Sequence, residues 1–189
     1  MKKKILIILG ILIALGGIFF SSVTGSQATE RVNKTWVITE KKVNTIFVGS
    51  SFQNIDISIQ ETSNDKTTVK VDGKITKDMK KKIQSISNEN GELNLDFQKH
   101  GLTLMAINDE KNPLKVTILL GRETTFKKIG VDSSLADINV EVPRNFNGIY
   151  KTKIDQDGKL KSIPESTEVS NSVISVSTSN GDISIKKGG

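Results

Sequence analysis

One short pattern of residues occurs three times in this chain and constrains its fold more than any other feature. In each copy a Ser/Thr-Ser pair leads to an Asp or Asn, followed directly by isoleucine and, two residues later, by another isoleucine or valine. The copies are SSFQNIDISI at residues 50–59, SSLADINVEV at 133–142 and TSNGDISI at 178–185. A weaker copy, NGELNL, places Leu93 where the others place Ile55, Ile138 and Ile183. Copies a few tens of residues apart are typical of a repeated supersecondary unit. The alternative is that an all-β chain simply reuses turn-then-strand chemistry.

Apolar residues recur mostly at every second position from Thr35 onward. Side chains alternate between the two faces of a strand, so this period buries one face and exposes the other. The residues in between are mostly Asp, Asn, Ser, Thr, Lys and Gln. Examples are Ile55-Ile57-Ile59, Val69-Val71, Leu93-Leu95-Phe97, Leu102-Leu104, Val116-Ile118-Leu120, Ile138-Val140-Val142, Ile174-Val176 and Ile183-Ile185. The pattern therefore predicts an all-β domain.

Turn dipeptides separate these apolar segments, because Gly and Asn tolerate positive φ. They are Asp72-Gly73, Asn90-Gly91, Asn147-Gly148, Asp157-Gly158 and Asn180-Gly181. We interpret the repeated motif as a polar corner whose Asp or Asn side chain bonds nearby backbone, followed by a strand with inward isoleucines. The expected fold is a β-solenoid or β-helix-like stack of short strands. A β-sandwich also accepts the pattern, but an aromatic content of only 5% fits a narrow aliphatic core better.

Composition excludes several classes of site. The chain has 189 residues and no cysteine, which rules out disulfides, thiolate metal sites and a cysteine nucleophile. Its single histidine, His100, cannot form a multi-histidine metal site. The net charge is +6, but Lys2, Lys3 and Lys4 contribute half of it, so a concentrated basic face for nucleic acid is not indicated. We expect no cofactor and no nucleic-acid partner.

The N-terminus has the pattern of an export or anchoring segment. Three lysines precede a run of apolar or glycine residues over positions 5–20, which a lipid bilayer would accept as a helix. By the positive-inside rule the lysines stay in the cytoplasm and the rest of the chain faces outward. We expect a retained single-pass anchor in the cell membrane. The alternative is a signal peptide cleaved near Ala28, since Ser26-Gln27-Ala28 resembles a small-x-small cleavage site.

The expected organisation has three parts: a signal-anchor at residues 1–28, a polar linker at 29–34 and an extracytoplasmic β-repeat domain at 35–189. Trp36 is expected to pack into the first strand of the domain, with a place at the membrane interface as the alternative. Residues 77–84 could form a helical turn. We expect Lys80, Lys81 and Lys82 to lie in a solvated loop, with Ile83 beginning a strand as a further option.

Several longer segments resemble the bacterial family named "putative adhesin", a domain without an assigned function in low-GC Gram-positive bacteria. The segments are VKVDGKITKD at residues 69–78, NGELNLDF at 90–97, the stretch from KVTILLG to ADINVEV at 115–142, and VSTSNGDISI at 176–185. Leu120-Gly121 and Leu135-Ala136 depart from the family's usual Leu-Pro and Ser-Gly. The resemblance implies a β-solenoid-like stack and carries no catalytic residues. With its N-terminal anchor the chain looks like the Lia-type proteins associated with cell-envelope stress.

Two groups of residues are candidate sites. Asn54, Glu92, Asp137 and Asp182 each precede an inward aliphatic residue, so stacked units would bring them into one polar file. Such a file could bind Ca²⁺ through oxygen ligands, but capping of each corner is the expectation, and we predict no metal site. A second group could meet an anionic partner such as a wall polymer, or serve only as a solvated face: Lys77, Lys80, Lys81, Lys82, Lys127 and Lys128. His100 is expected in an exposed turn, and we predict no catalytic residue.

These observations lead to three hypotheses of function. The first is a non-enzymatic, membrane-anchored, adhesin-like interaction module outside the cell, with a membrane regulator protein or an anionic wall polymer as partner. A role in the envelope stress response would follow by analogy with the family. The second is a carbohydrate-active enzyme on a cell-surface polysaccharide, disfavoured by only three arginines and few aromatics. The third, adhesion to a host surface, rests on the family name.

Overall fold

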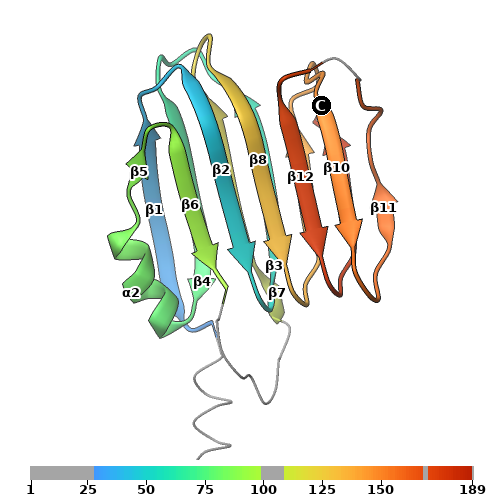
Figure 1. The fold of residues 1–189 in the computed structure, drawn as a ribbon. Coiled ribbons are helices and arrows are strands. Elements are labelled where there is room, and N and C mark those ends of the chain that lie inside the picture. The colour runs from blue at the N-terminus through green and yellow to red at the C-terminus, as the bar shows by residue number, and fades with distance from the viewer. Residues whose placement is uncertain (1–27, 99–108, 168–169, 189) are drawn as a thin grey trace, which may run out of the picture.

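The computed structural model of the chain describes residues 28–98, 109–167 and 170–188. Most of this part is strand, arranged in two sheets that pack face to face (Figure 1). The first sheet has seven strands, in the spatial order β1 (Glu30–Ile38), β4 (Thr67–Ile75), β7 (Asp109–Leu120), β3 (Gln53–Glu61), β9 (Ile138–Val142), β13 (Ile183–Lys187) and β11 (Leu160–Ser162). The second has six, in the order β10 (Ile149–Ile154), β12 (Val173–Thr178), β8 (Thr125–Ser133), β2 (Lys42–Ser50), β6 (Glu92–Phe97) and β5 (Asn88–Glu89). The predicted all-β class is confirmed.

The core lies between the two sheets and consists mainly of Ile, Val and Leu. The alternation predicts which side chains enter it: Ile55, Ile57 and Ile59 on β3 are all nearly fully buried, while Asp56 and Ser58 between them are partly exposed. Trp36 is also buried, so it packs into the first strand as predicted. At one end of the core Phe126, Phe146 and Tyr150 form an aromatic cluster, with ring centroids 5.5 and 5.6 Å apart.

The repeated motif is a structural repeat. Each copy takes the chain from the six-stranded sheet across a polar corner into the seven-stranded sheet: β2 to β3, β8 to β9 and β12 to β13. The strands after the corners are parallel and in register, so that Ile138 lies between Ile55 and Ile183. The three isoleucines therefore form one inward file, as the sequence predicts.

The order of the units differs from that of a β-solenoid, in which successive units stack. Here β6–β7 lies outside β2–β3, although the chain reaches it before β8–β9, and β10–β11 lies outside β12–β13, although the chain reaches it before β12–β13. Strands β4 and β1 extend the first sheet in antiparallel fashion. The fourth copy of the motif does not take the predicted place: Leu93 lies on β6 in the other sheet, opposite Ile46, and Leu114 lies beside Ile55 instead.

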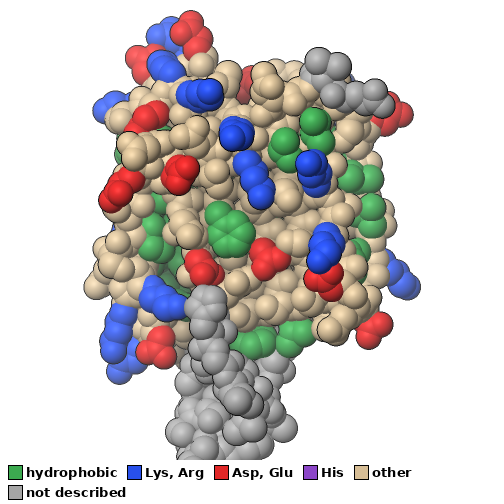
Figure 2. Space-filling view, in the orientation of Figure 1, with side chains coloured by type: hydrophobic (Ala, Val, Ile, Leu, Met, Phe, Trp, Pro, Cys, Tyr) green, Lys and Arg blue, Asp and Glu red, His purple; other side chains and the backbone are tan. Residues whose placement is uncertain are grey.

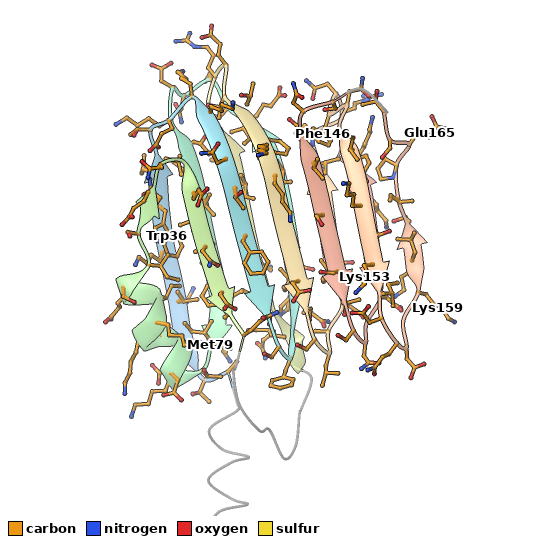
Figure 3. The ribbon with its side chains drawn as sticks, viewed as in Figure 1. Trp36, Met79, Phe146, Lys153, Lys159 and Glu165 are labelled. Atoms are coloured by element: carbon orange, nitrogen blue, oxygen red, sulfur yellow. The ribbon has the colours of Figure 1, made fainter. Side chains whose placement is uncertain are left out.

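A helix stands where a loop was expected. The segment α2 (Lys77–Ser85) begins with Thr76 as its N-cap, whose Oγ1 accepts a hydrogen bond of 3.3 Å from the main-chain N–H of Met79. Ile83 is buried, and Met79 packs against the core. Just beyond the helix, the Ile86 carbonyl accepts a 3.0 Å hydrogen bond from the Trp36 indole. The helix thus covers one end of the two-layered core, beside β1 and β5 (Figures 1 and 3). The loop prediction was wrong because this packing is not a local property.

The N-terminal boundaries also need correction. Strand β1 begins at Glu30 and pairs with β4 along its whole length, so most of the expected linker at residues 29–34 is strand. Val32 anchors it in the core. The expected anchor lies almost entirely in residues 1–27, outside the described part. Within the described part, no helix has the length and apolarity that a membrane span requires.

Most of the predicted turns lie between strands. Asn90 and Gly91 have φ of 53° and 72° and join β5 to β6 as a hairpin, which is the geometry that favours Asn-Gly. Asn180-Gly181 lies in the corner between β12 and β13, and Asp157-Gly158 between β10 and β11. Asp72-Gly73 is the exception, because both residues lie inside β4.

Candidate binding surfaces

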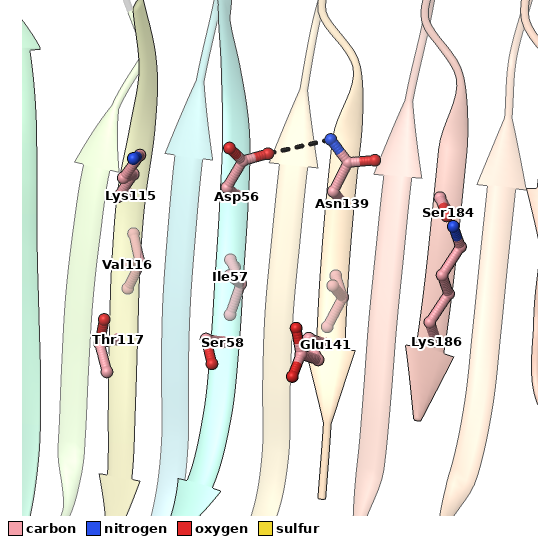
Figure 4. A pocket seen from close by; sticks show the side chains of 11 residues that line it. Asp56, Ile57, Ser58, Lys115, Val116, Thr117, Asn139, Glu141, Ser184 and Lys186 are labelled. Carbon is pink, nitrogen blue, oxygen red and sulfur yellow. Dashed lines mark hydrogen bonds between the residues drawn. The ribbon is translucent and has the colours of Figure 1, made fainter. Parts of the chain in front are cut away.

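The outer face of the seven-stranded sheet carries a shallow groove of about 460 Å³ that crosses four parallel strands (Figure 4). Its walls come from β7, β3, β9 and β13. The lining residues are Asp56, Ile57, Ser58, Lys115, Val116, Thr117, Asn139, Val140, Glu141, Ser184 and Lys186. Most of them are the outward residues of their strands.

Strand register arranges these outward side chains in two rows across the strands. The first row contains, in spatial order, Lys115, Asp56, Asn139 and Ser184. The second contains Thr117, Ser58, Glu141 and Lys186. Neighbours in a row are about 4.8 Å apart, the spacing of strands in a sheet. Each row therefore presents hydrogen-bonding groups at a regular interval.

One hydrogen bond within the groove is direct: the Asn139 side-chain amide donates to Asp56 Oδ1 over 2.9 Å (Figure 4). The four charged residues balance, with one lysine in each row and a carboxylate from each of β3 and β9. Across the described ranges, no set of three or more His, Asp or Glu side chains is arranged to hold a metal ion. The groove is thus a polar surface of mixed charge with both donors and acceptors.

The predicted polar file is brought together at three of its four positions. The main-chain N–H of Asp137 donates to Asn54 Oδ1 over 3.0 Å, and that of Asp182 donates to Asp137 Oδ1 over 2.7 Å. The ladder continues when the N–H of Lys159 donates to Asp182 Oδ1 over 2.8 Å. Glu92 is not part of it, because it lies on β6 in the other sheet. Each side chain in this Asx ladder ties its own corner to the next unit.

The end of the Asx ladder carries an ion pair. Lys161 Nζ lies 2.7 Å from Asp182 Oδ2. The hydrogen bond from Lys161, together with that from the Lys159 main chain, lowers the pKa of Asp182, and the same contact raises the pKa of Lys161. Both oxygens of Asp182 are therefore engaged within the protein.

The predicted lysine group is divided between two places. Lys77, Lys80, Lys81 and Lys82 lie on α2 at one edge of the molecule. Lys80 forms a 2.7 Å ion pair with Glu30, and this contact lowers the pKa of that glutamate. Lys127 and Lys128 lie exposed on β8, which β2 and β6 separate from the edge strand β5. The two groups do not form one patch.

The remaining residues of interest are His100 and the arginines. His100 lies outside the described residues. Of the arginines, Arg122 forms an exposed ion pair of 2.7 Å with Asp65, and none lines the groove.

The repeated motif predicts inward and corner positions, so the groove residues are not among the sites expected from the sequence. The motif nevertheless contains a pattern that predicts part of the groove. The residue after each aligned isoleucine is Asp56, Asn139 or Ser184, and these three share the first row. Lys115 could not have been placed in the same way, because β7 carries no copy of the motif.

Comparison with known proteins finds one distant structural neighbour and no match by sequence. No family model and no curated protein matches the chain. One solved structure is similar, described as a putative cell adhesion protein from Clostridium sporogenes. It has 11% sequence identity and a TM-score of 0.34, over 83% of this chain and 100% of the other. Membership of the family named in the sequence analysis stays a prediction.

Proposed function

We propose that this protein is a non-catalytic, adhesin-like binding module that holds an extended partner along the groove of the seven-stranded sheet. The observation that carries the proposal is the pair of in-register polar rows across β7, β3, β9 and β13. An open, regular surface suits a chain-like partner that repeats its polar groups, whereas a small molecule is usually enclosed in a deeper pocket.

The charges of the groove indicate which partner fits. Lys115 and Lys186 are balanced by Asp56 and Glu141, so a strongly anionic polymer gains little net attraction there. A neutral or mixed-charge wall polymer, or an extended segment of a membrane regulator protein, is the better match. The apolar N-terminal segment would hold the module at the outer surface of the cell membrane, where both partners are found. A part in the envelope stress response would follow if the partner is a regulator.

A carbohydrate-active enzyme is the second candidate, since Asp56 and Glu141 lie in one groove and glycosidases use paired carboxyl groups. Neither carboxylate is desolvated, however: Glu141 is exposed and Asp56 is partly exposed and bonded to Asn139. A catalytic acid usually needs burial to keep its proton near neutral pH. The binding module is therefore the function that the groove supports better.

Site-specific photocrosslinking in intact cells tests the proposal. A photoreactive phenylalanine analogue is introduced into the full-length chain at Lys115 or Glu141 in the groove, and at Lys151 on β10 as the control. All three positions are exposed. We expect the same partner to be captured from both groove positions and not from Lys151. A polymer adduct would indicate wall binding and a protein adduct signalling.

Two results would count against this function. Equal capture at Lys151, or no adduct from either groove position, would remove the groove as the binding surface. Release of new reducing ends from isolated wall polysaccharide, lost in the Glu141→Gln variant, would favour the enzyme instead.

A further inference from the structure

The outer face of the six-stranded sheet has one aromatic ring near its middle. Ile46 and Val48 on β2 are fully buried, so Phe47 between them points outward and is only partly buried. Figure 2 shows this face, with an isolated hydrophobic side chain over β2 and acidic and basic side chains around it. A phenylalanine on the outer face of a sheet needs an explanation, because the alternation of side chains otherwise places mostly polar residues there.

Two glycines provide the space in which this ring lies. Gly130 is directly opposite Phe47 on β8, and a Cβ there would come within 3.2 Å of Phe47 Cδ2. Gly49, two residues further along β2, also has no room for a side chain, since a Cβ there would be 3.0 Å from Phe47 Cε1. Both contacts are tighter than ordinary van der Waals distance. The ring is therefore held against the backbone of two strands.

Polar groups with fixed positions flank the ring. On the other side of β2, the exposed Asn94 on β6 is the direct neighbour of Phe47. Asp132 lies on β8 two residues beyond Gly130. It accepts hydrogen bonds from the Ser177 hydroxyl and from the Gln98 side-chain amide. Asp96 Oδ1 accepts a 2.9 Å hydrogen bond from the Gln98 main chain. The two carboxylates lie on either side of Gly49 in the sheet.

We propose that this surface, defined by Phe47, Asn94, Asp96 and Asp132, is a carbohydrate-binding platform. The face of an aromatic ring is electron-rich and attracts the slightly positive C–H groups on the flat side of a pyranose ring. The flanking carboxylates and the amide accept or donate hydrogen bonds to sugar hydroxyl groups. The ligand class is a polysaccharide of β-1,4-linked pyranose rings, which exposes such flat faces in a regular array.

The competing explanation is structural. An aromatic side chain over glycines in a neighbouring strand can stabilise a sheet without binding anything. That role depends on apolar bulk over the glycines, and leucine supplies much of it. Sugar stacking depends on the aromatic face, which leucine lacks. The Phe47→Leu variant therefore separates the two explanations.

Saturation-transfer NMR and calorimetry on the full-length chain in detergent provide the test. The probes are chitohexaose, cellohexaose and xylohexaose. We expect at least one to bind, with Phe47→Leu and Phe47→Ala weakening it about tenfold or more and Phe47→Trp retaining it. The matched control is Val37→Ala, which truncates an exposed apolar side chain on the other sheet (44% exposed). It should leave binding unchanged.

The platform would be refuted if none of the three oligosaccharides binds the wild-type chain, or if Phe47→Leu binds as the wild type does. Urea unfolding of each variant identifies any that has lost its fold. Phe47→Tyr then serves as a second variant, because it keeps the aromatic face and should keep binding. The groove lies on the opposite sheet, so failure here leaves the proposed function of the groove untouched, and the reverse also holds.

Discussion

At the scale of single residues, the Asx ladder explains why the motif repeats its Asp or Asn. A corner between two sheets leaves main-chain N–H groups outside the strand pairing, and a buried or half-buried N–H without a partner is costly. Asn54, Asp137 and Asp182 solve this by accepting from the N–H of the next unit. The motif therefore stabilises contacts between units as well as the turn itself.

The Asp137→Ala variant tests the Asx ladder. It leaves the Asp182 N–H without its 2.7 Å acceptor, and we expect a loss of about 1–2 kcal/mol of unfolding free energy. Asp137→Asn keeps the acceptor oxygen and should retain most of that stability. Urea unfolding with an unchanged m-value measures both. Equal losses in the two variants would mean that charge, and not the hydrogen bond, matters at this position.

At the scale of elements, α2 shows how tertiary contacts can determine a short segment. A helix of nine residues is marginal in isolation, because nucleation is costly. It forms here because Ile83 and Met79, four residues apart, face the core and Thr76 caps the first turn. The spacing and the cap were visible in the sequence, but the run of lysines favoured a loop.

Removal of the N-cap should weaken this helix selectively. We expect Thr76→Ala to lose about 1 kcal/mol and to increase hydrogen exchange of the α2 amides, because the Met79 N–H loses its acceptor. Thr76→Asp, which keeps a good capping oxygen, is the matched control. If exchange rises equally across β9 and β13, the cap does not act locally and this account of α2 is wrong.

At the scale of the whole molecule, the two ends of the stack differ. One is covered by α2, while the other ends in β10 and β11, which are edge strands of their sheets. The final strand β13 is paired with β9 on one side and with β11 on the other, so the edge of this sheet is β11 and not the C-terminal strand. Leu160 and Ile163 are exposed at this end (45% and 40%). Lys151 and Lys153 on β10 are exposed as well (Lys153 is labelled in Figure 3).

Lysines on an edge strand oppose pairing between sheets of different molecules. We therefore expect the double variant Lys151→Thr, Lys153→Thr to self-associate, measured by size-exclusion chromatography with light scattering. The matched control, Lys127→Thr with Lys128→Thr, removes the same charge from the central strand β8 and should behave as the wild type. Association of both variants would assign the effect to net charge and not to the edge.

The amino-acid sequence by itself determined the strands, the polar corners and the inward file of Ile55, Ile138 and Ile183. These follow from the alternation of side chains along one strand and from hydrogen bonds over a few residues, which are local properties. Only the tertiary structure decided that β6–β7 lies outside β2–β3 and β10–β11 outside β12–β13, that Leu93 belongs to the other sheet, and which outward residues form the groove. The physical reason is that the units carry nearly the same motif, so each offers the same edge to several neighbours. The choice among them rests on long-range packing that no local pattern records.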